Sequence, residues 1–212
     1  MEENLIYIGD AYLSRVKLAL LGLDYFDGTE RERAPELLAI EPFNRPLYEL
    51  LYAAIVTGVE DYLQSRLKKD VLVSEDAMRK YLKKYNYTYR RKKDKQIAYS
   101  EDTPLTEEIR EKIIESLELH VYHRIDMVAD YLEAVTSIKI PEDELWNQMH
   151  DIIQTRHVII HEGGRFPNGE RIALTPSHVH QALNVSERFI EQTENLFFQK
   201  GNGFIYDIPE DE

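Results

Sequence analysis

Apolar side chains recur at helical spacing along nearly the whole of this 212-residue chain, and no segment shows the strict alternation typical of a strand. The clearest stripe follows Pro46, a residue suited to a first helical turn. Its members are Leu47, Leu50, Leu51, Ala54, Ile55, Val59, Tyr62 and Leu63. Gly58 lies on the stripe, where the lack of a side chain would let another helix approach closely. The pattern predicts an all-α fold.

Start and stop signals divide the chain into further helices. Ser74 and Thr106 are typical N-cap residues, and each is followed by acidic residues that favour a first turn. Thr175 and Pro176 begin a last helix, and Gly163 and Gly164 help to end the one before it. In chain order, we expect a helix over residues 5–23, a helix that starts at Pro46, and a short helix over residues 74–85. A further helix starts at residue 106, and helices continue over residues 119–135. The last two helices run from residue 141 to the glycines at 163 and 164, and over residues 175–197.

Size and composition set limits on organisation and location. With 43% apolar residues, the chain can bury a full core as a single helical domain over residues 1–200, with a core at about 46–197 and a basic insertion at about 74–105. Residues 201–212, with four acids, form a flexible acidic tail. The absence of cysteine excludes disulfides and thiolate metal sites, and no apolar run resembles a signal peptide or membrane span. We therefore expect a soluble, cytoplasmic protein without a membrane partner.

A cation occupies a core position in the predicted helix that starts near residue 141. Arg156 stands where the apolar period requires the next core residue, because it continues a stripe made of Met149, Ile152, Ile153 and Ile160. Unpaired burial of a guanidinium costs several kcal/mol, so Arg156 needs a carboxylate or an anionic ligand. His157 and His161 lie close to it in sequence. The planar guanidinium of arginine presents N–H donors that match the oxygens of a phosphate, and an imidazole can transfer protons near neutral pH. Together these groups suggest phosphodiester chemistry.

Two other interpretations of these residues stay open. Arg156 can be a structural cation that pairs with Glu60 or another acid. His157 and His161 also have the spacing of a two-His metal site, although Val158 stands where the HExxH pattern has glutamate and no third ligand is evident. We expect neither a metal nor a cofactor. The remaining histidines are expected in ordinary places, His120 and His123 as hydrogen-bonded helix residues and His178 and His180 in the first turn of the last helix.

The net charge of −13 argues against general coating of nucleic acid, so any contact with RNA must be local. Residues 85–95 are the candidate, since alternating tyrosines precede five cations in a segment expected to be strand or loop. The proposed RNA-binding residues are Tyr87, Tyr89, Arg90, Arg91, Lys92 and Lys93. An exposed insertion whose charges are simply solvated has the same composition.

The pattern of Arg156, His157 and His161 resembles the Arg-x4-6-His motif of HEPN domains, the helical "higher eukaryotes and prokaryotes nucleotide-binding" family. Residues 50–67, which contain VTGVEDYLQSRL, resemble an earlier HEPN helix in which an acid precedes an aromatic-Leu pair. HVYHRIDMVADYL and RHVIIHEGGRFPNGERI resemble RNA-processing branches of the family. The resemblance covers roughly residues 46–197, and only its Arg-x4-His core is specific as a motif.

This resemblance implies an all-α HEPN-like helical bundle with a basic, Tyr-rich insertion, in which two motifs face each other across a homodimer. The centre would be a metal-independent endoribonuclease, in which an RNA 2′-hydroxyl attacks its own phosphate. His161 would be general base or acid, Arg156 would stabilise the phosphate charge, and His157 would position the phosphate or His161. Glu60 or Asp61 would hold Arg156. Side chains five residues apart point about 140° away from each other on an ideal helix, so Arg156 and His161 of one chain converge poorly. A helix that ends at Glu162, or a second subunit, can bring them together.

The resemblance also implies a role in toxin-antitoxin systems or anti-phage defence, with an antitoxin or neighbouring regulatory protein as a partner. The chain departs from the toxins that are partnered by nucleotidyltransferases, because Gly163 stands where those often have tyrosine. Regulation by modification of that tyrosine is therefore not expected. The alternative function is a non-catalytic helical interaction or nucleotide-binding module with a structural Arg156.

Overall fold

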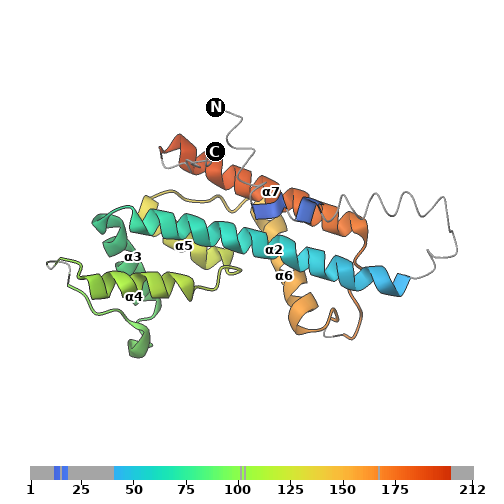
Figure 1. Ribbon diagram of the computed structural model, residues 1–212, viewed down its shortest axis with the longest axis horizontal. Helices are drawn as coiled ribbons and strands as arrows, with labels where there is room; N and C mark the ends of the chain where they lie inside the picture. Colours follow the sequence, from blue (N-terminus) through green and yellow to red (C-terminus); the bar gives the residue numbers. More distant parts are fainter. Residues whose placement is uncertain are drawn as a thin grey trace, which may run out of the picture. The chain divides into compact units, whose positions relative to one another are not determined.

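The computed structural model describes residues 12–14, 16–18, 41–100, 102, 104–166 and 168–201, and every regular element among them is helical (Figure 1). The all-α fold class expected from the sequence is confirmed. The helices are α2 (Glu41–Leu72), α3 (Glu75–Thr88), a 3-10 turn (Lys93–Lys95), α4 (Glu107–Glu118), α5 (Ile125–Thr136), α6 (Glu144–His161) and α7 (Pro176–Gln199). Residues 12–14 and 16–18 are also helical.

The contacts divide the chain into two compact units. The first contains Met1–Val59 and Glu142–Glu212, and the second is Glu60–Pro141. Helix α2 contributes its first half to one unit and its second half to the other. The single domain over residues 1–200 that the sequence suggests stays a prediction.

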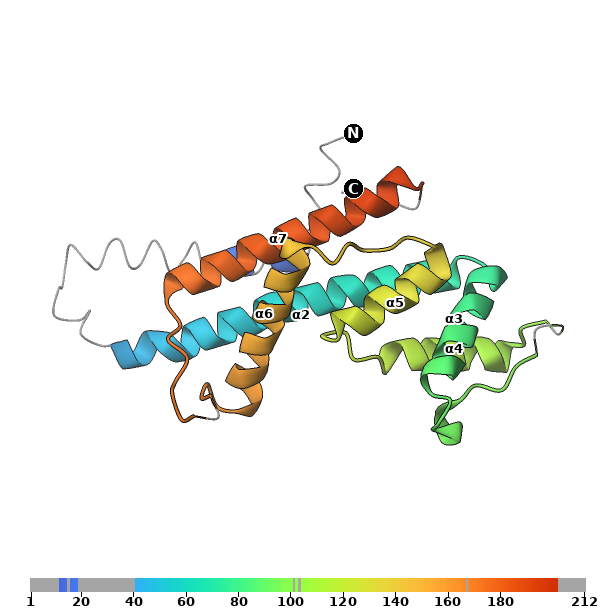
Figure 2. The same ribbon diagram turned by 180° about the vertical axis from the view of Figure 1, so that it is seen from behind.

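In the first unit, α6 packs against α7, and Figure 2 shows it crossing the first half of α2 at a steep angle. The apolar core of this unit includes the buried residues Leu51, Ile55, Met149, Ile153, Phe189 and Ile190. Gly58 permits the close approach expected of it, because a Cβ there would lie 2.8 Å from Leu13 Cδ2 and 2.9 Å from the Tyr12 carbonyl oxygen.

In the second unit, α3 packs against α5, and the core is rich in tyrosine. This core also contains a cation that the sequence analysis did not single out. Arg66 on α2 has no exposed surface, and its Nε and a terminal nitrogen each donate to a different carboxylate oxygen of Asp70 at 2.8 Å. A two-point contact of this kind is what makes a guanidinium tolerable in a core.

Several helix ends differ from those expected. Helix α2 begins at Glu41 and not at Pro46, and Leu47, Leu50 and Ala54 are exposed, so the buried face is narrower than the predicted stripe. Helix α6 begins three residues after Pro141, because Asp143 accepts the Trp146 amide at 3.0 Å and acts as its N-cap. Residues 119–124 are not helical, and α3 extends to Thr88.

Other local signals are confirmed. Ser74 Oγ accepts the Ala77 amide at 3.2 Å, and Thr106 Oγ1 accepts the Ile109 amide at 3.3 Å, so both residues are N-caps. Pro176 takes the first position of α7 after Thr175. The expected acidic tail falls, except for Gly201, outside the described residues, as does most of the helix expected at 5–23. Within the described part of the chain, no helix is long and apolar enough to cross a membrane.

Candidate functional site at the end of helix α6

Arg156 lies five residues before the end of α6. One of its hydrogen-bond donors, Nε, has no partner. Its side chain is half-buried, and its Nε is enclosed without a hydrogen bond. None of the described residues forms an ion pair with it. A buried donor without a partner costs about 1–3 kcal/mol, and the cost is larger for charged groups. Arg156 is therefore neither a solvated surface cation nor a core cation matched by a carboxylate of the described chain.

Glu60, the residue expected to hold Arg156, belongs to the second unit and faces His123 there. Its Oε1 lies 3.2 Å from His123 Nδ1, within ion-pair range but without hydrogen-bond alignment. Support of Arg156 by Glu60 stays a prediction. His123 itself lies in the non-helical segment between α4 and α5, so the expectation that it is a helix residue was wrong.

His157 and His161 come together on one side of α6. Both are exposed, and their ring centroids are 4.6 Å apart at an interplanar angle of 44°. Ile160, which the sequence placed on the apolar stripe, is 48% exposed, whereas Ile159 is buried. The buried face of α6 thus turns away from the histidine pair, and a substrate can reach both imidazoles from solvent.

Two glycines end the helix immediately after the motif. The amides of Glu162 and Gly164 both donate to the Val158 carbonyl oxygen, at 3.1 and 3.0 Å. Gly163 and Gly164 have φ angles of 61° and 70°, a region that favours glycine over residues with a Cβ. His161 is consequently the last residue of α6, and Asn168 and Gly169 form the expected turn in the loop that follows, with the Gly169 amide 2.8 Å from the Phe166 carbonyl.

The basic segment begins as helix, where a strand or loop was expected, and continues as a loop from Tyr89. Tyr85 and Tyr87 lie in the last turn of α3, and Tyr89 caps it. The Tyr85 and Tyr89 rings are 4.7 Å apart, and the Arg90 guanidinium lies 4.5 Å from the centre of the Tyr87 ring. Tyr87 is 63% exposed, but Arg90 covers one face of its ring.

The loop after α3 is held by one side chain. Asn86 donates to the Ile97 carbonyl at 2.8 Å and accepts the Ile97 amide at 2.9 Å. Within the loop that these bonds close, Arg90, Arg91, Lys92 and Lys93 are all exposed. The cations therefore project from a fixed loop, which lowers the ordering cost of binding a phosphate chain.

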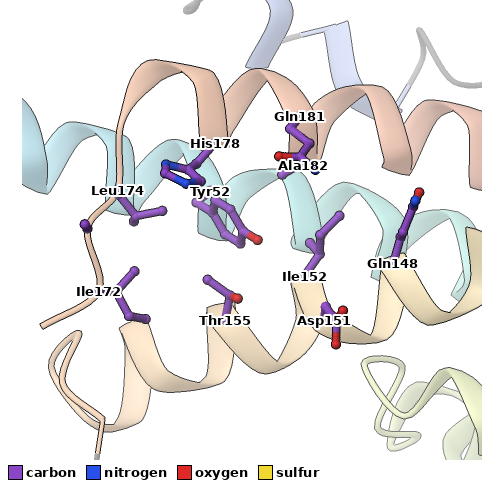
Figure 3. Close-up of a pocket in the computed structure, with 11 residues that line it drawn as sticks. Tyr52, Gln148, Asp151, Ile152, Thr155, Ile172, Leu174, His178, Gln181 and Ala182 are labelled. Carbon is purple, nitrogen blue, oxygen red and sulfur yellow. The ribbon is translucent and has the colours of Figure 1, made fainter. Parts of the chain in front are cut away.

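A pocket that the sequence analysis missed lies in the first unit and reaches Thr155, the residue before Arg156 (Figure 3). It has a volume of about 240 Å³ and is bounded by α2, α6, α7 and the segment before α7. Burial raises the pKa of the Tyr52 phenol, the Thr155 side chain opposes this rise, and the Asp151 carboxylate adds to it. The spacing of Gln148, Asp151, Ile152 and Thr155 could have indicated a shared face of α6, but residues from α2 and α7 complete the pocket.

His120 is the most perturbed histidine and lies in the core of the second unit. It is 8% exposed among tyrosine rings, its Nε2 is 2.9 Å from the Tyr81 hydroxyl oxygen, and burial lowers its pKa to about 4. The expected hydrogen bond is present, although His120 follows α4 and is not helical. It serves the core and does not belong to the exposed site on α6.

Comparison of the chain with protein-family models, with curated proteins and with solved structures gives no match in any of the three. Among the described residues, no group of three or more His, Cys, Asp and Glu side chains is arranged to hold a metal ion.

Proposed function

We propose that this chain is a metal-independent endoribonuclease of the HEPN type, with its centre at Arg156, His157 and His161. The observation that supports this most strongly is the half-buried Arg156, whose Nε lacks a partner, on the same helix as two exposed, adjacent imidazoles. A phosphate would satisfy the guanidinium, and imidazoles carry protons near neutral pH. This combination suits the cleavage of a phosphodiester.

In the proposed reaction, the RNA 2′-oxygen forms a bond to the adjacent phosphorus as the bond to the 5′-oxygen breaks. One imidazole takes the 2′-hydroxyl proton, and a protonated imidazole gives a proton to the leaving 5′-oxygen. His161 is the principal proton-transfer group, and His157 takes the other of these two roles. Arg156 stabilises the charge on the phosphoryl oxygens. The products are a 2′,3′-cyclic phosphate and a free 5′-hydroxyl, and no water or metal is consumed.

The centre is proposed to form between two copies of the chain. Arg156 and His161 are separated by about 140° around an ideal helix, and Arg156 is half-buried whereas His161 is exposed. One subunit therefore directs the two side chains apart. Ile160 is an exposed apolar residue beside His161, and a two-fold axis near it would bury both copies and bring each Arg156 toward the other subunit's histidines. Light scattering should give a dimer at micromolar concentration, and Ile160→Asp should give a monomer.

RNA is proposed to reach this centre with help from the basic segment at the end of α3. A base can stack on the uncovered face of Tyr87 or on the Arg90 guanidinium that lies over the other face. The exposed cations from Arg90 to Lys93 would hold the RNA backbone. An enzyme of this kind needs restraint, so an antitoxin or neighbouring protein in a defence system remains part of the proposal.

The decisive experiment is incubation of the purified protein with total RNA in excess chelator. Wild-type protein should cut RNA and leave cyclic phosphate ends, while His161→Ala and Arg156→Ala should each remove most cleavage. Arg156→Lys should restore it only partly, because lysine lacks the planar fork. Two exposed residues of α7 supply matched controls, His180→Ala and Arg188→Ala, which should cut like the wild type. Cleavage that chelator abolishes and zinc restores would contradict the proposal, as would equal activity of His161→Ala and wild type.

A further inference from the structure

The pocket beside Arg156 has a polar end and an apolar end. Figure 3 shows the Tyr52 hydroxyl pointing toward the α6 side, between Ile152 and Thr155, while Ile172 and Leu174 lie at the opposite end. Its volume of about 240 Å³ exceeds the ~150 Å³ cavity that holds benzene and is below the ~300 Å³ at which pockets for drug-sized ligands begin. The space suits one flat ring system with its attached group left outside.

The polar end combines one strong acceptor with a donor. Asp151 is exposed, and its carboxylate has no hydrogen bond or ion pair with any described residue. The Tyr52 phenol stays protonated because burial raises its pKa, so it can donate. His178 lies beside Leu174, away from Asp151, and its Nδ1 accepts the Thr175 amide at 3.2 Å.

Of the three motif residues, Arg156 is the one that lies toward the pocket side of α6. Asp151, Ile152 and Thr155 line the pocket at helical spacing, and Arg156 continues that face four residues after Ile152, a rise of about 6 Å. A ring in the pocket would therefore carry an attached phosphate toward Arg156. The nearby cation also disfavours a guanidinium or ammonium ligand, although Asp151 alone would accept either.

We propose that this pocket binds a guanine base and, through it, selects where RNA is cut. Guanine presents two adjacent donors, N1–H and the 2-amino group, which match the two oxygens of the Asp151 carboxylate. Its O6 would accept a donor at the polar end, the Tyr52 hydroxyl. Adenine and cytosine each place a ring acceptor beside their amino group, and uracil flanks its single donor with two acceptors, so each would direct a lone pair at the carboxylate.

The binding part of the proposal is independent of catalysis, and only the selection of cut sites rests on the proposed ribonuclease activity. Calorimetric titration of the full chain carrying His161→Ala measures binding without cleavage. Guanosine 5′-monophosphate should bind, and inosine 5′-monophosphate, which lacks the 2-amino group, should bind at least about tenfold more weakly. The adenosine, cytidine and uridine monophosphates should be weaker still.

Asp151→Asn tests the carboxylate with little change of shape at an exposed position. It should weaken guanosine monophosphate binding by at least about tenfold and remove the preference over inosine monophosphate. Gln154→Ala, also exposed on α6 but not part of the pocket, should bind like its parent. Equal affinity for all four nucleotides, binding of arginine amide in place of guanosine monophosphate, or no binding would each overturn the proposal.

Cut-site mapping then separates the two proposals. If wild-type protein cuts RNA beside guanine and Asp151→Asn cuts without base preference, both hold. Guanosine monophosphate binding by a protein that cuts no RNA would leave the pocket assignment standing and refute the ribonuclease. Cleavage without preference for guanine would refute the role of the pocket and leave the ribonuclease standing.

Discussion

His120 should make the second unit less stable as the pH falls from 7 to 5. Its ring lies 4.7 Å from that of Tyr131 and 5.9 Å from that of Tyr81. Ser116 Oγ donates to the Ile113 carbonyl at 2.7 Å, so it must accept the Tyr81 hydroxyl proton, 2.9 Å away. His120 Nε2 must then donate to the Tyr81 oxygen. The neutral imidazole already satisfies this contact, and a second proton would add only a buried charge.

The pKa shift gives both the sign and the size of the effect. Burial lowers the pKa of His120 to about 4, whereas an unfolded histidine titrates near 6.5. Between these two values the unfolded chain binds a proton that the folded chain does not, so the free energy of unfolding falls as the pH falls. The slope approaches about 1.4 kcal/mol per pH unit, and the loss between pH 7 and pH 5 amounts to about 2 kcal/mol.

Urea unfolding followed by far-ultraviolet circular dichroism, at pH 7 and pH 5, measures this loss. The comparison is His120→Gln, which keeps an N–H donor for Tyr81 and cannot take up a proton in this range. Between pH 7 and pH 5, the free energy of unfolding should fall by about 2 kcal/mol more for the wild-type protein than for the variant. Carboxylates elsewhere contribute equally to both proteins. His180→Gln, at an exposed position, should behave like the wild type. If wild type and His120→Gln lose the same stability, the assigned burial of a neutral imidazole is wrong.

Three further outcomes follow from the packing and from the basic segment. Gly58→Ala should lower the free energy of unfolding by about 1–3 kcal/mol in a denaturant titration, because the new Cβ would meet Leu13 and the Tyr12 carbonyl oxygen; an unchanged midpoint would contradict that close approach. Asp70→Leu should cost about 3–5 kcal/mol by leaving the Arg66 charge buried without its carboxylate, while Asp70→Leu combined with Arg66→Met should cost much less; equal losses would show that the pair is not coupled. Replacing Arg90, Arg91, Lys92 and Lys93 by glutamine should weaken RNA binding at low salt and flatten its salt dependence, and an unchanged slope would place the RNA path elsewhere.

Local features of the fold followed from the sequence. The caps at Ser74 and Thr106 and the glycines after α6 act within a few residues of the chain, so their chemistry alone locates helix ends. The helical period likewise indicates the all-α class. The adjacency of His157 and His161 is also local, since residues four apart share one side of any helix.

Tertiary packing decided which polar residues are enclosed. The period along α6 indicated Arg156 as a core cation, yet Arg156 is only half-buried, whereas Arg66 has no exposed surface. Asp70 supplies both carboxylate oxygens to Arg66 from one turn away inside the second unit. The helical period also predicted that Leu50 on α2 and Ile160 on α6 are core residues, and both are exposed. A stripe gives the direction of a side chain but not whether another element covers it.

The pocket and the His120 cluster depended on tertiary structure for the same reason. Tyr52, Thr155 and His178 stand on three helices far apart in the sequence, and no spacing along the chain brings them together. His120 owes its lowered pKa to tyrosines from α3 and α5 that surround it. Helix formation is decided by neighbours in sequence, whereas burial, pKa and cavities are decided by neighbours in space.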